Sequence, residues 1–272
     1  QMPRLVGLAQ ASKVYRTNKN LHGLDVTKKF SNQGNEVAFG TIGDASTSEG
    51  PFWESINAAG VMQIPLVMSV WDDGYGISVP RKYQTTKGSI SDALAGMQRT
   101  DSKAGYEIFV TRGWDYPHLC ETYEKAVKLA RNEHIPVLIH VKEVNQPQGH
   151  STSGSHERYK SAERLQWEKD FDCIEKFKAW ILDFNINGQI IGTEDELNQI
   201  QSEAKKTVRD AKNKSWKKFT NDINSDLKEA CSLLFEIAEV SEQKVFIHKE
   251  REALEKAYEP IRKDIFSTVR KV

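Results

Sequence analysis

Two short apolar segments, residues 37–41 and 66–70, flank a segment with helical periodicity, and this pattern constrains the fold more than any other part of the chain. The apolar and β-branched residues of both segments are typical of buried strands. Between them, Phe52, Ile56 and Ala59 recur at the spacing of one helix face. A strand, a helix and a strand joined by short connections favour a right-handed crossover and a parallel sheet.

An acidic residue follows each strand of this unit: Asp44 follows the first and Asp73 the second. Parallel strands end at the same edge of a sheet, where ligands of open α/β folds bind. Residues 46–48 can begin the intervening helix, and the N–H groups at a helix start favour a phosphate. Because Mg²⁺ accepts both carboxylate and phosphate oxygens, it allows these groups to share one site. The pattern therefore predicts a metal–diphosphate site at this edge.

Small residues surround the first acidic position, and they would let a phosphate approach the backbone: Gly43, Ala45 and Ser46. Residues 43–44 alone, or 72–74 alone, are also typical of ordinary turns. Their combination at one sheet edge favours the metal–diphosphate site.

The two motifs resemble those of thiamine-diphosphate enzymes, above all the α half of the first, decarboxylating component of 2-oxo acid dehydrogenase complexes. In that family, Gly-Asp-Gly-Ala-x-Ser-Glu-Gly is followed, one helix and one strand later, by Asn-Asn-x-Tyr-x-Ile-Ser. This chain has Gly-Asp-Ala-Ser-Thr-Ser-Glu-Gly at 43–50 and Asp-Asp-Gly-Tyr-Gly-Ile-Ser at 72–78. The resemblance implies an α/β fold with the doubly wound parallel sheet of thiamine-diphosphate enzymes, followed by a helical tail.

The resemblance also implies roles for individual residues. Asp44 and Asp73 would bind Mg²⁺ through their side chains, and Tyr75 through its backbone carbonyl. The same three residues would contact thiamine diphosphate, together with small and apolar residues of both motifs: Gly43, Ala45, Ser46, Trp71 and Ile77.

Three residues depart from the family pattern. Ala45 replaces a glycine, which is a small change where backbone contacts dominate. Asp73 replaces an asparagine, and Mg²⁺ accepts a carboxylate readily. Trp71 stands where branched-chain relatives have an arginine near the phosphates, so one cationic contact is absent. We expect cofactor binding to survive these changes.

A loop rich in Ser, Gly and His, residues 146–156, follows a third apolar strand at 136–141. It resembles a Gly-His-Ser-Thr-Ser loop of the family, where the preceding strand lies at the edge of the sheet. The resemblance implies that His150 contacts the cofactor and is catalytic, since imidazole can donate to a phosphate or a reacting oxygen. Ser151 matches a serine that some members regulate by phosphorylation. A lone loop histidine is otherwise more often simply solvated.

Residues 3–15 have the periodicity of a helix, with Leu5, Leu8, Ala9 and Ser12 facing inward. The small residues in this segment indicate that another backbone packs closely against it.

The alternation of strands and helices continues with a strand at 106–110 and an amphipathic helix at 116–132. After about residue 161 the composition becomes charged and helical. We therefore expect two domains: a cofactor-binding α/β domain over residues 1–160, and a helical extension over 161–272 that leads toward a β half.

The 272-residue chain carries 38 basic and 38 acidic residues, so its formal net charge is zero. This balance argues against nucleic acid or a membrane surface as the main partner. The three cysteines have no metal-binding spacing, which indicates reduced thiols and a cytoplasmic location. Because the chain begins inside a patterned segment, we expect it to be part of a longer protein.

By this resemblance the chain is an oxidoreductase component that decarboxylates a 2-oxo acid, either branched-chain or pyruvate, and passes the acyl group to a lipoyl-bearing acyltransferase. A β-type half would supply the activating glutamate, so this chain alone should be inactive. The resemblance implies an α/β dimer of dimers. Two alternatives remain open: a transketolase-like thiamine-diphosphate enzyme, and a non-catalytic interaction module with a degenerate cofactor site.

Overall fold

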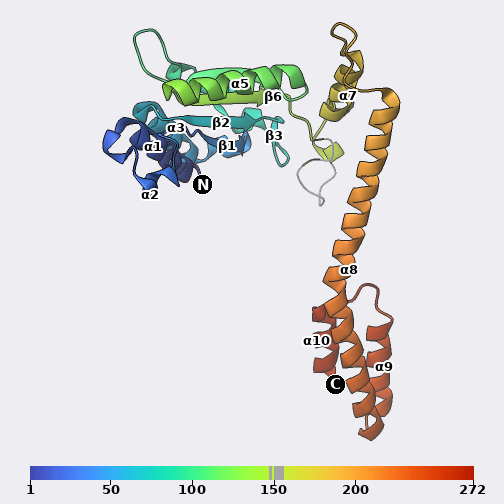
Figure 1. The fold of residues 1–272 in the computed structure, drawn as a ribbon. Helices are drawn as coiled ribbons and strands as arrows, with labels where there is room; N and C mark the ends of the chain where they lie inside the picture. Colours follow the sequence, from blue (N-terminus) through green and yellow to red (C-terminus); the bar gives the residue numbers. More distant parts are fainter. Residues whose placement is uncertain (147–148, 150–155) are drawn as a thin grey trace. The chain divides into compact units, whose positions relative to one another are not determined.

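The computed structural model describes these residues of the chain: 1–146, 149 and 156–272. They form two compact units, residues 1–191 and residues 192–272 (Figure 1). The composition shift near residue 161 does not coincide with this boundary. The first two helices after the shift belong to the first unit.

A parallel four-stranded sheet forms the centre of the first unit, in the order β1-β2-β6-β5 (Figure 1). Its strands are β1 Ala38–Gly43, β2 Leu66–Trp71, β5 Glu107–Arg112 and β6 Val137–Lys142. Helix α3 (Gly50–Met62) connects β1 to its parallel neighbour β2, which confirms the predicted strand–helix–strand unit. Strand β6 lies between β2 and β5, so the expectation of an edge strand at this position is wrong.

Helices cover both faces of the sheet, which confirms the doubly wound α/β fold. Alternate residues of β2 show this arrangement: Met68 packs in a core with Phe52 and Ile56 of α3, whereas Val67 packs with Ala126 of α5 (Tyr116–Glu133). Figure 1 shows α5 on one side of the sheet and α1 (Met2–Thr17) with α3 on the other. Burial on both faces explains why these strands read as continuous apolar runs.

Another backbone packs closely on α1, as its small residues predicted: a Cβ atom at Gly34 would lie 2.4 Å from the carbonyl oxygen of Ser12. A Cβ atom at Gly40 would lie 2.3 Å from Cδ1 of Leu5, so a larger residue there would have to displace the end of the Leu5 side chain. Ala9 and Ser12 are buried as expected. The prediction for Leu8 is wrong: it is 64% exposed, because Val6 rather than Leu8 completes the buried stripe of the helix.

The start of α3 differs from the expected capping. Residues Ala45–Ser48 form a short 3-10 helix, and α3 begins at Gly50 without a side-chain cap. The hydroxyls that were expected to cap the helix have other partners. Thr47 Oγ1 donates to the carbonyl of Asp44 (2.5 Å), and Ser48 Oγ donates to the carbonyl of Gln84 (2.8 Å).

The remaining elements of the first unit are short, and they are η1 Lys19–Leu21, α2 Asp25–Lys28, β3 Tyr75–Gly76, β4 Val79–Pro80, η3 Arg81–Tyr83, η4 Thr86–Gly88, α4 Ile90–Ala93, η5 Ala95–Met97, η6 His156–Arg158, α6 Ala162–Asp170 and α7 Cys173–Asp183. Strands β3 and β4 pair as an antiparallel hairpin that begins within the second motif.

The second unit consists of three helices: α8 Glu194–Val240, α9 Lys244–Glu255 and α10 Arg262–Lys271. A capping box begins α8 at Thr193, as the side chains of Thr193 and Glu196 bond to each other's backbone N–H groups. Buried residues of all three helices share one core, which includes Ile223, Leu254 and Ile265. Within the described part of the chain, no helix has the length and apolarity needed to cross a membrane.

Candidate functional site

A cleft of about 560 Å³ lies at the carboxyl edge of the sheet, where β1 and β2 end. Its lining includes residues of both sequence motifs: Gly43, Asp44, Ala45, Ser46, Trp71, Asp73, Tyr75, Gly76 and Ile77. Gln84, Val144 and Gln146 also line it. The structure thus brings together every predicted cofactor and metal residue that it describes. His150 and Ser151 lie outside the described residues.

Asp44 is the buried acid of the cleft, with only 6% of its surface exposed. Burial, together with the negative charges of Asp72 and Asp73, raises the pKa of its carboxyl group to about 7. Hydrogen bonding to backbone N–H groups only partly offsets this effect. A cation bound beside Asp44 would offset the repulsion among the carboxylates of Asp44, Asp72 and Asp73.

Asp72 is a buried acid that the sequence argument did not use. Its Oδ1 accepts the N–H of Gly74 (2.8 Å), and its Oδ2 accepts Nη1 of Arg81 (2.6 Å) and Nε2 of His140 (2.9 Å). Burial alone would raise the pKa of Asp72, but its hydrogen bonds to His140 and Arg81, with the positive charge of Arg81, hold this pKa below its usual range. The negative charge of Asp72 is therefore balanced within the protein.

His140 completes this buried network from the middle of β6, where it is fully buried. Its Nδ1 lies 2.9 Å from Oγ of Ser91. A signal for this role was present in the sequence, because a histidine inside a buried apolar strand requires hydrogen-bond partners. The identity of those partners depends on which strand and helix lie beside β6.

The turn after β2 fixes the second motif. The N–H of Tyr75 donates to Oδ1 of Asp73 (3.0 Å), and the N–H of Arg81 donates to the carbonyl of Gly74 (2.9 Å). Gly74 has φ +85°, a conformation that glycine adopts without strain. Since a carboxylate has several acceptor sites, this bond to Tyr75 is compatible with metal binding by Asp73.

Two glycines shape the cleft wall. A Cβ atom at Gly43 would meet no atom within 4 Å, so the end of β1 is open to a ligand. At Gly76, by contrast, a Cβ atom would lie 2.8 Å from the methyl carbon of Ala45. The methyl group of Ala45 therefore fits because the facing residue, Gly76, has no side chain. The structure thus accommodates alanine at the position where the family motif has glycine.

Trp71 is 52% exposed at the cleft, and its Nε1 donates to Oγ of Ser69 (3.0 Å). Among the described residues that line the cleft, there is no lysine, arginine or histidine side chain. A phosphate in the described part of this cleft would meet small residues and carboxylates. A metal ion would therefore have to supply the positive charge.

These donors suit Mg²⁺ bound to a diphosphate. Mg²⁺ takes one or two carboxylates and completes its shell with phosphate oxygens and water. Across the described ranges, no group of three or more His, Cys, Asp and Glu side chains is arranged to hold a metal. The carboxylates of Asp44 and Asp73, which line the cleft, fit a metal ion whose remaining ligands are phosphate oxygens and water.

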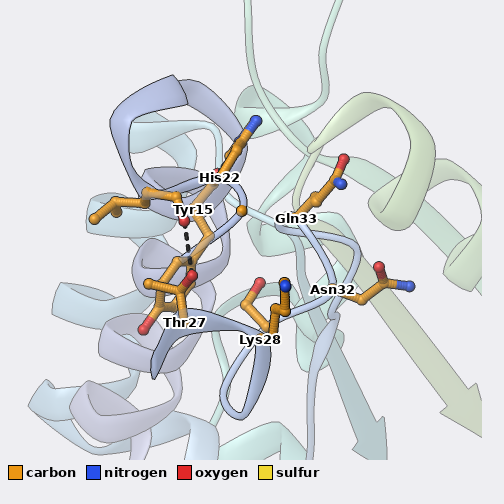
Figure 2. Close-up of a pocket in the computed structure, with 9 residues that line it drawn as sticks. Tyr15, His22, Thr27, Lys28, Asn32 and Gln33 are labelled. Carbon is orange, nitrogen blue, oxygen red and sulfur yellow. Dashed lines mark hydrogen bonds between the residues drawn. The ribbon is translucent and has the colours of Figure 1, made fainter. Parts of the chain in front are cut away.

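A second hollow, of about 260 Å³, lies among residues 15–33 (Figure 2). Polar groups that line it bond to nearby backbone: His22 Nε2 contacts the carbonyl of Tyr15 (2.7 Å), and Thr27 Oγ1 donates to the carbonyl of Leu21 (2.7 Å). The neighbouring Arg16 donates to the carbonyl of Arg131, shortly before β6 begins. This hollow therefore belongs to the opposite, amino edge of the sheet.

The chain is similar to one protein family and to several known proteins. Residues 1–224 match the family described as Dehydrogenase E1 component. Pyruvate dehydrogenase E1 component subunit alpha of Rickettsia bellii is 25% identical over 191 residues, which cover 70% of this chain and 53% of that protein. Mitochondrial 2-oxoisovalerate dehydrogenase subunit alpha 1 of Arabidopsis thaliana is 28% identical over 175 residues, 62% of this chain and 34% of that protein.

The alpha subunit of acetoin:2,6-dichlorophenolindophenol oxidoreductase from Bacillus subtilis is 29% identical over 161 residues, 59% of this chain and 45% of that protein. The chain spans about half the length of the first of these relatives, and less of the others. Among solved structures, transketolase from Campylobacter jejuni aligns with a TM-score of 0.40 and 15% identity, over 65% of this chain and 29% of that chain.

Proposed function

The chain belongs to the dehydrogenase E1 component family, and on that premise we propose that its cleft holds the Mg²⁺–diphosphate end of thiamine diphosphate. The observation that carries the proposal is the acidic cleft at the carboxyl edge of the sheet. There, Asp44 and Asp73 line one wall with the open end of β1, and the pKa of Asp44 is raised to about 7. A bound divalent cation would favour the ionised form of Asp44.

In this proposal, Asp44 and Asp73 bind Mg²⁺ through their carboxylates, and Tyr75 binds it through its backbone carbonyl. Gly43, Ala45 and Ser46 lie against the diphosphate. Trp71 and Ile77 contribute apolar contacts with the cofactor. His150 remains a predicted catalytic contact.

We propose that the reaction is the decarboxylation of a 2-oxo acid, followed by transfer of the acyl group to a lipoyl-bearing partner. Thiamine diphosphate, when bound, supplies the nucleophilic carbon for this chemistry. The residues of this chain anchor the diphosphate and neutralise its charge through the metal. A β-type half would complete the site, and the assembly would be an α/β dimer of dimers in the cytoplasm.

The family match over residues 1–224 supports this reaction over a transketolase-like one. The names of the relatives support pyruvate or a branched-chain 2-oxo acid as the substrate class.

Turnover by the chain assembled with its β-type half tests this function. Pyruvate, 3-methyl-2-oxobutanoate and a ketose phosphate are offered with thiamine diphosphate, Mg²⁺ and an artificial electron acceptor. We expect turnover of one of the 2-oxo acids, its loss in Asp73→Ala, and none by this chain alone. Turnover of the ketose phosphate alone, or by the isolated chain, would contradict the proposal.

A further inference from the structure

Three charged side chains of the first unit form a buried cluster for which the proposed cofactor chemistry has no use: Lys160, Arg164 and Glu168. Nζ of Lys160 lies 2.8 and 2.9 Å from the two carboxylate oxygens of Glu168, and Nε of Arg164 lies 2.9 Å from Oε1. The side chains of Lys160 and Glu168 are only 2% and 1% exposed. Because burying charges is unfavourable even when they are paired, this cluster calls for an explanation beyond stability.

The cluster bonds to both walls of the cleft. Nη2 of Arg164 donates to the backbone carbonyl of Asp73 (2.9 Å), at the end of β2. Nζ of Lys160 donates to the carbonyl of Gln146 (2.9 Å), which follows β6. Asp73 and Gln146 both line the cleft. Glu168 thus pairs with both Lys160 and Arg164. Each of these two cations donates to a backbone carbonyl on a different wall of the cleft.

The same cations contact the ring of Tyr75. The guanidinium carbon of Arg164 lies 5.6 Å from the centre of that ring, and Nζ of Lys160 lies 5.4 Å from it. The ring of Tyr159 lies 5.5 Å away. Cations near the face of an aromatic ring attract it, so the Tyr75 side chain is held by the cluster on helix α6 and the residues before it.

We propose that Arg164, Lys160 and Glu168 are positioning residues that set the metal-binding turn 73–75 against the cleft. Arg164 fixes the peptide that follows Asp73, and the ring contacts fix Tyr75, whose carbonyl is the proposed backbone ligand. The cluster acts through these two residues and does not itself touch the metal. This inference rests on the proposed Mg²⁺–diphosphate site.

Titration calorimetry with thiamine diphosphate and Mg²⁺, on the chain assembled with its β-type half, tests the inference. Arg164→Met keeps most of the side-chain length but removes the N–H groups, and it should raise the Kd about 10- to 100-fold, as loss of an outer-shell partner does. Arg164→Lys keeps the charge but not the fork that reaches two partners, so its Kd should lie in between. Arg262→Met, in the exposed pair with Asp226, should bind like the wild type.

Hydrogen–deuterium exchange separates positioning from a general loss of stability. In metal-free Arg164→Met, exchange should become faster in residues 72–78 and stay unchanged in β5. Glu168→Gln should give the same pattern with a larger loss of stability. If Arg164→Met kept the wild-type affinity and exchange rates while Asp44→Ala lost binding, the positioning role would be overturned and the metal site would stand. Absence of metal-dependent binding by the wild type would overturn both the site and the inference.

Discussion

Asp44 and Asp72 lie at the same edge of the sheet and are both nearly buried, yet the pKa values of their carboxyl groups move in opposite directions. Asp72 accepts hydrogen bonds from Gly74, Arg81 and His140, and the bonds from His140 and Arg81 hold its pKa low. Within the described residues, Asp44 has no ion pair with a cationic side chain, and burial raises its pKa. The fold therefore compensates the negative charge of Asp72, whereas Asp44 has no cationic side-chain partner among the described residues.

Under the proposed function, this difference separates an acid that stabilises the fold, Asp72, from an acid that binds the metal, Asp44. A carboxylate with internal partners should matter for stability, because its loss leaves those partners buried and unpaired. A carboxylate that burial destabilises should matter for binding, because a cation is what it lacks. Substitutions at the two positions should therefore have different effects.

The largest effect on stability is expected from Asp72→Ala. This change leaves Nε2 of the fully buried His140 without a hydrogen-bond partner and removes the partner of Arg81. The free energy of unfolding should fall by about 3–5 kcal/mol, as for other broken buried ion pairs. Urea denaturation measures this change, and a loss below about 1 kcal/mol would place Asp72 among ordinary surface positions.

Asp44→Asn should have the opposite sign in metal-free protein. The folded state binds a proton at Asp44 more tightly than the unfolded state, since its folded pKa is about 7. The contribution of Asp44 to stability is therefore lost as the pH rises from about 4 to about 7. At pH 8, Asp44→Asn should raise the free energy of unfolding by about 2–4 kcal/mol.

Urea denaturation at pH 5 and pH 8 with a chelator provides the measurement. The two proteins should differ less at pH 5 than at pH 8, because the loss begins near pH 4 and is complete only above pH 7. Added Mg²⁺ should reduce the difference at pH 8. If the stability of both proteins had the same pH dependence, the contrast between Asp44 and Asp72 would be wrong, because the charge of Asp44 would then be compensated like that of Asp72.

The two glycines of the cleft wall should also separate stability from binding. A Cβ atom in Gly76→Ala would lie 2.5 Å from Gln84 and 2.8 Å from Ala45, which should cost about 1–3 kcal/mol of stability. The added substitution Ala45→Gly should recover part of that loss. Gly43→Ala adds a methyl group in open space, so it should leave stability nearly unchanged and weaken cofactor binding. Thermal denaturation measures the loss of stability, and calorimetry measures the cofactor Kd. Equal changes in both quantities for Gly43→Ala and Gly76→Ala would contradict this account.

Ser91→Ala should give the smallest effect. Its hydroxyl is 2.9 Å from Nδ1 of His140, at the far end of the Asp72 network from the cleft. Loss of this hydrogen bond should lower the free energy of unfolding by about 1 kcal/mol. Cofactor affinity should stay the same, and a clear loss of affinity would show that the network acts on the metal site directly.

Local pattern was enough to predict the strand–helix–strand unit and the edge at which Asp44 and Asp73 meet. Burial of Phe52, Ile56 and Ala59 followed directly from their spacing. The order of the strands was not accessible in this way, because the apolar run of β6 gives no information about its neighbours. For that reason the interior position of β6 and the partners of His140 became clear only in the fold.

The failures elsewhere also have physical causes. Thr47 and Ser48 have the chemistry of helix caps, but a 3-10 turn directs their hydroxyls to Asp44 and Gln84 instead. Neighbouring acids such as Asp72 and Asp73 look equivalent in the sequence, although their side chains differ in direction and partners. The contact of Arg164 with Asp73 joins residues 91 positions apart, and no local pattern announces it.

Calorimetric titration of thiamine diphosphate into the chain assembled with its β-type half, with and without Mg²⁺, tests the central claim most directly. Asp44→Ala and Asp73→Ala remove the proposed ligands, and Asp101→Ala, at an exposed turn, is the matched control. The account predicts binding that requires Mg²⁺, is lost in both ligand variants and is kept in the control. Absence of binding by the wild type would contradict the account and favour a non-catalytic interaction module. Binding that survives in both ligand variants would contradict the assignment of Asp44 and Asp73 as metal ligands.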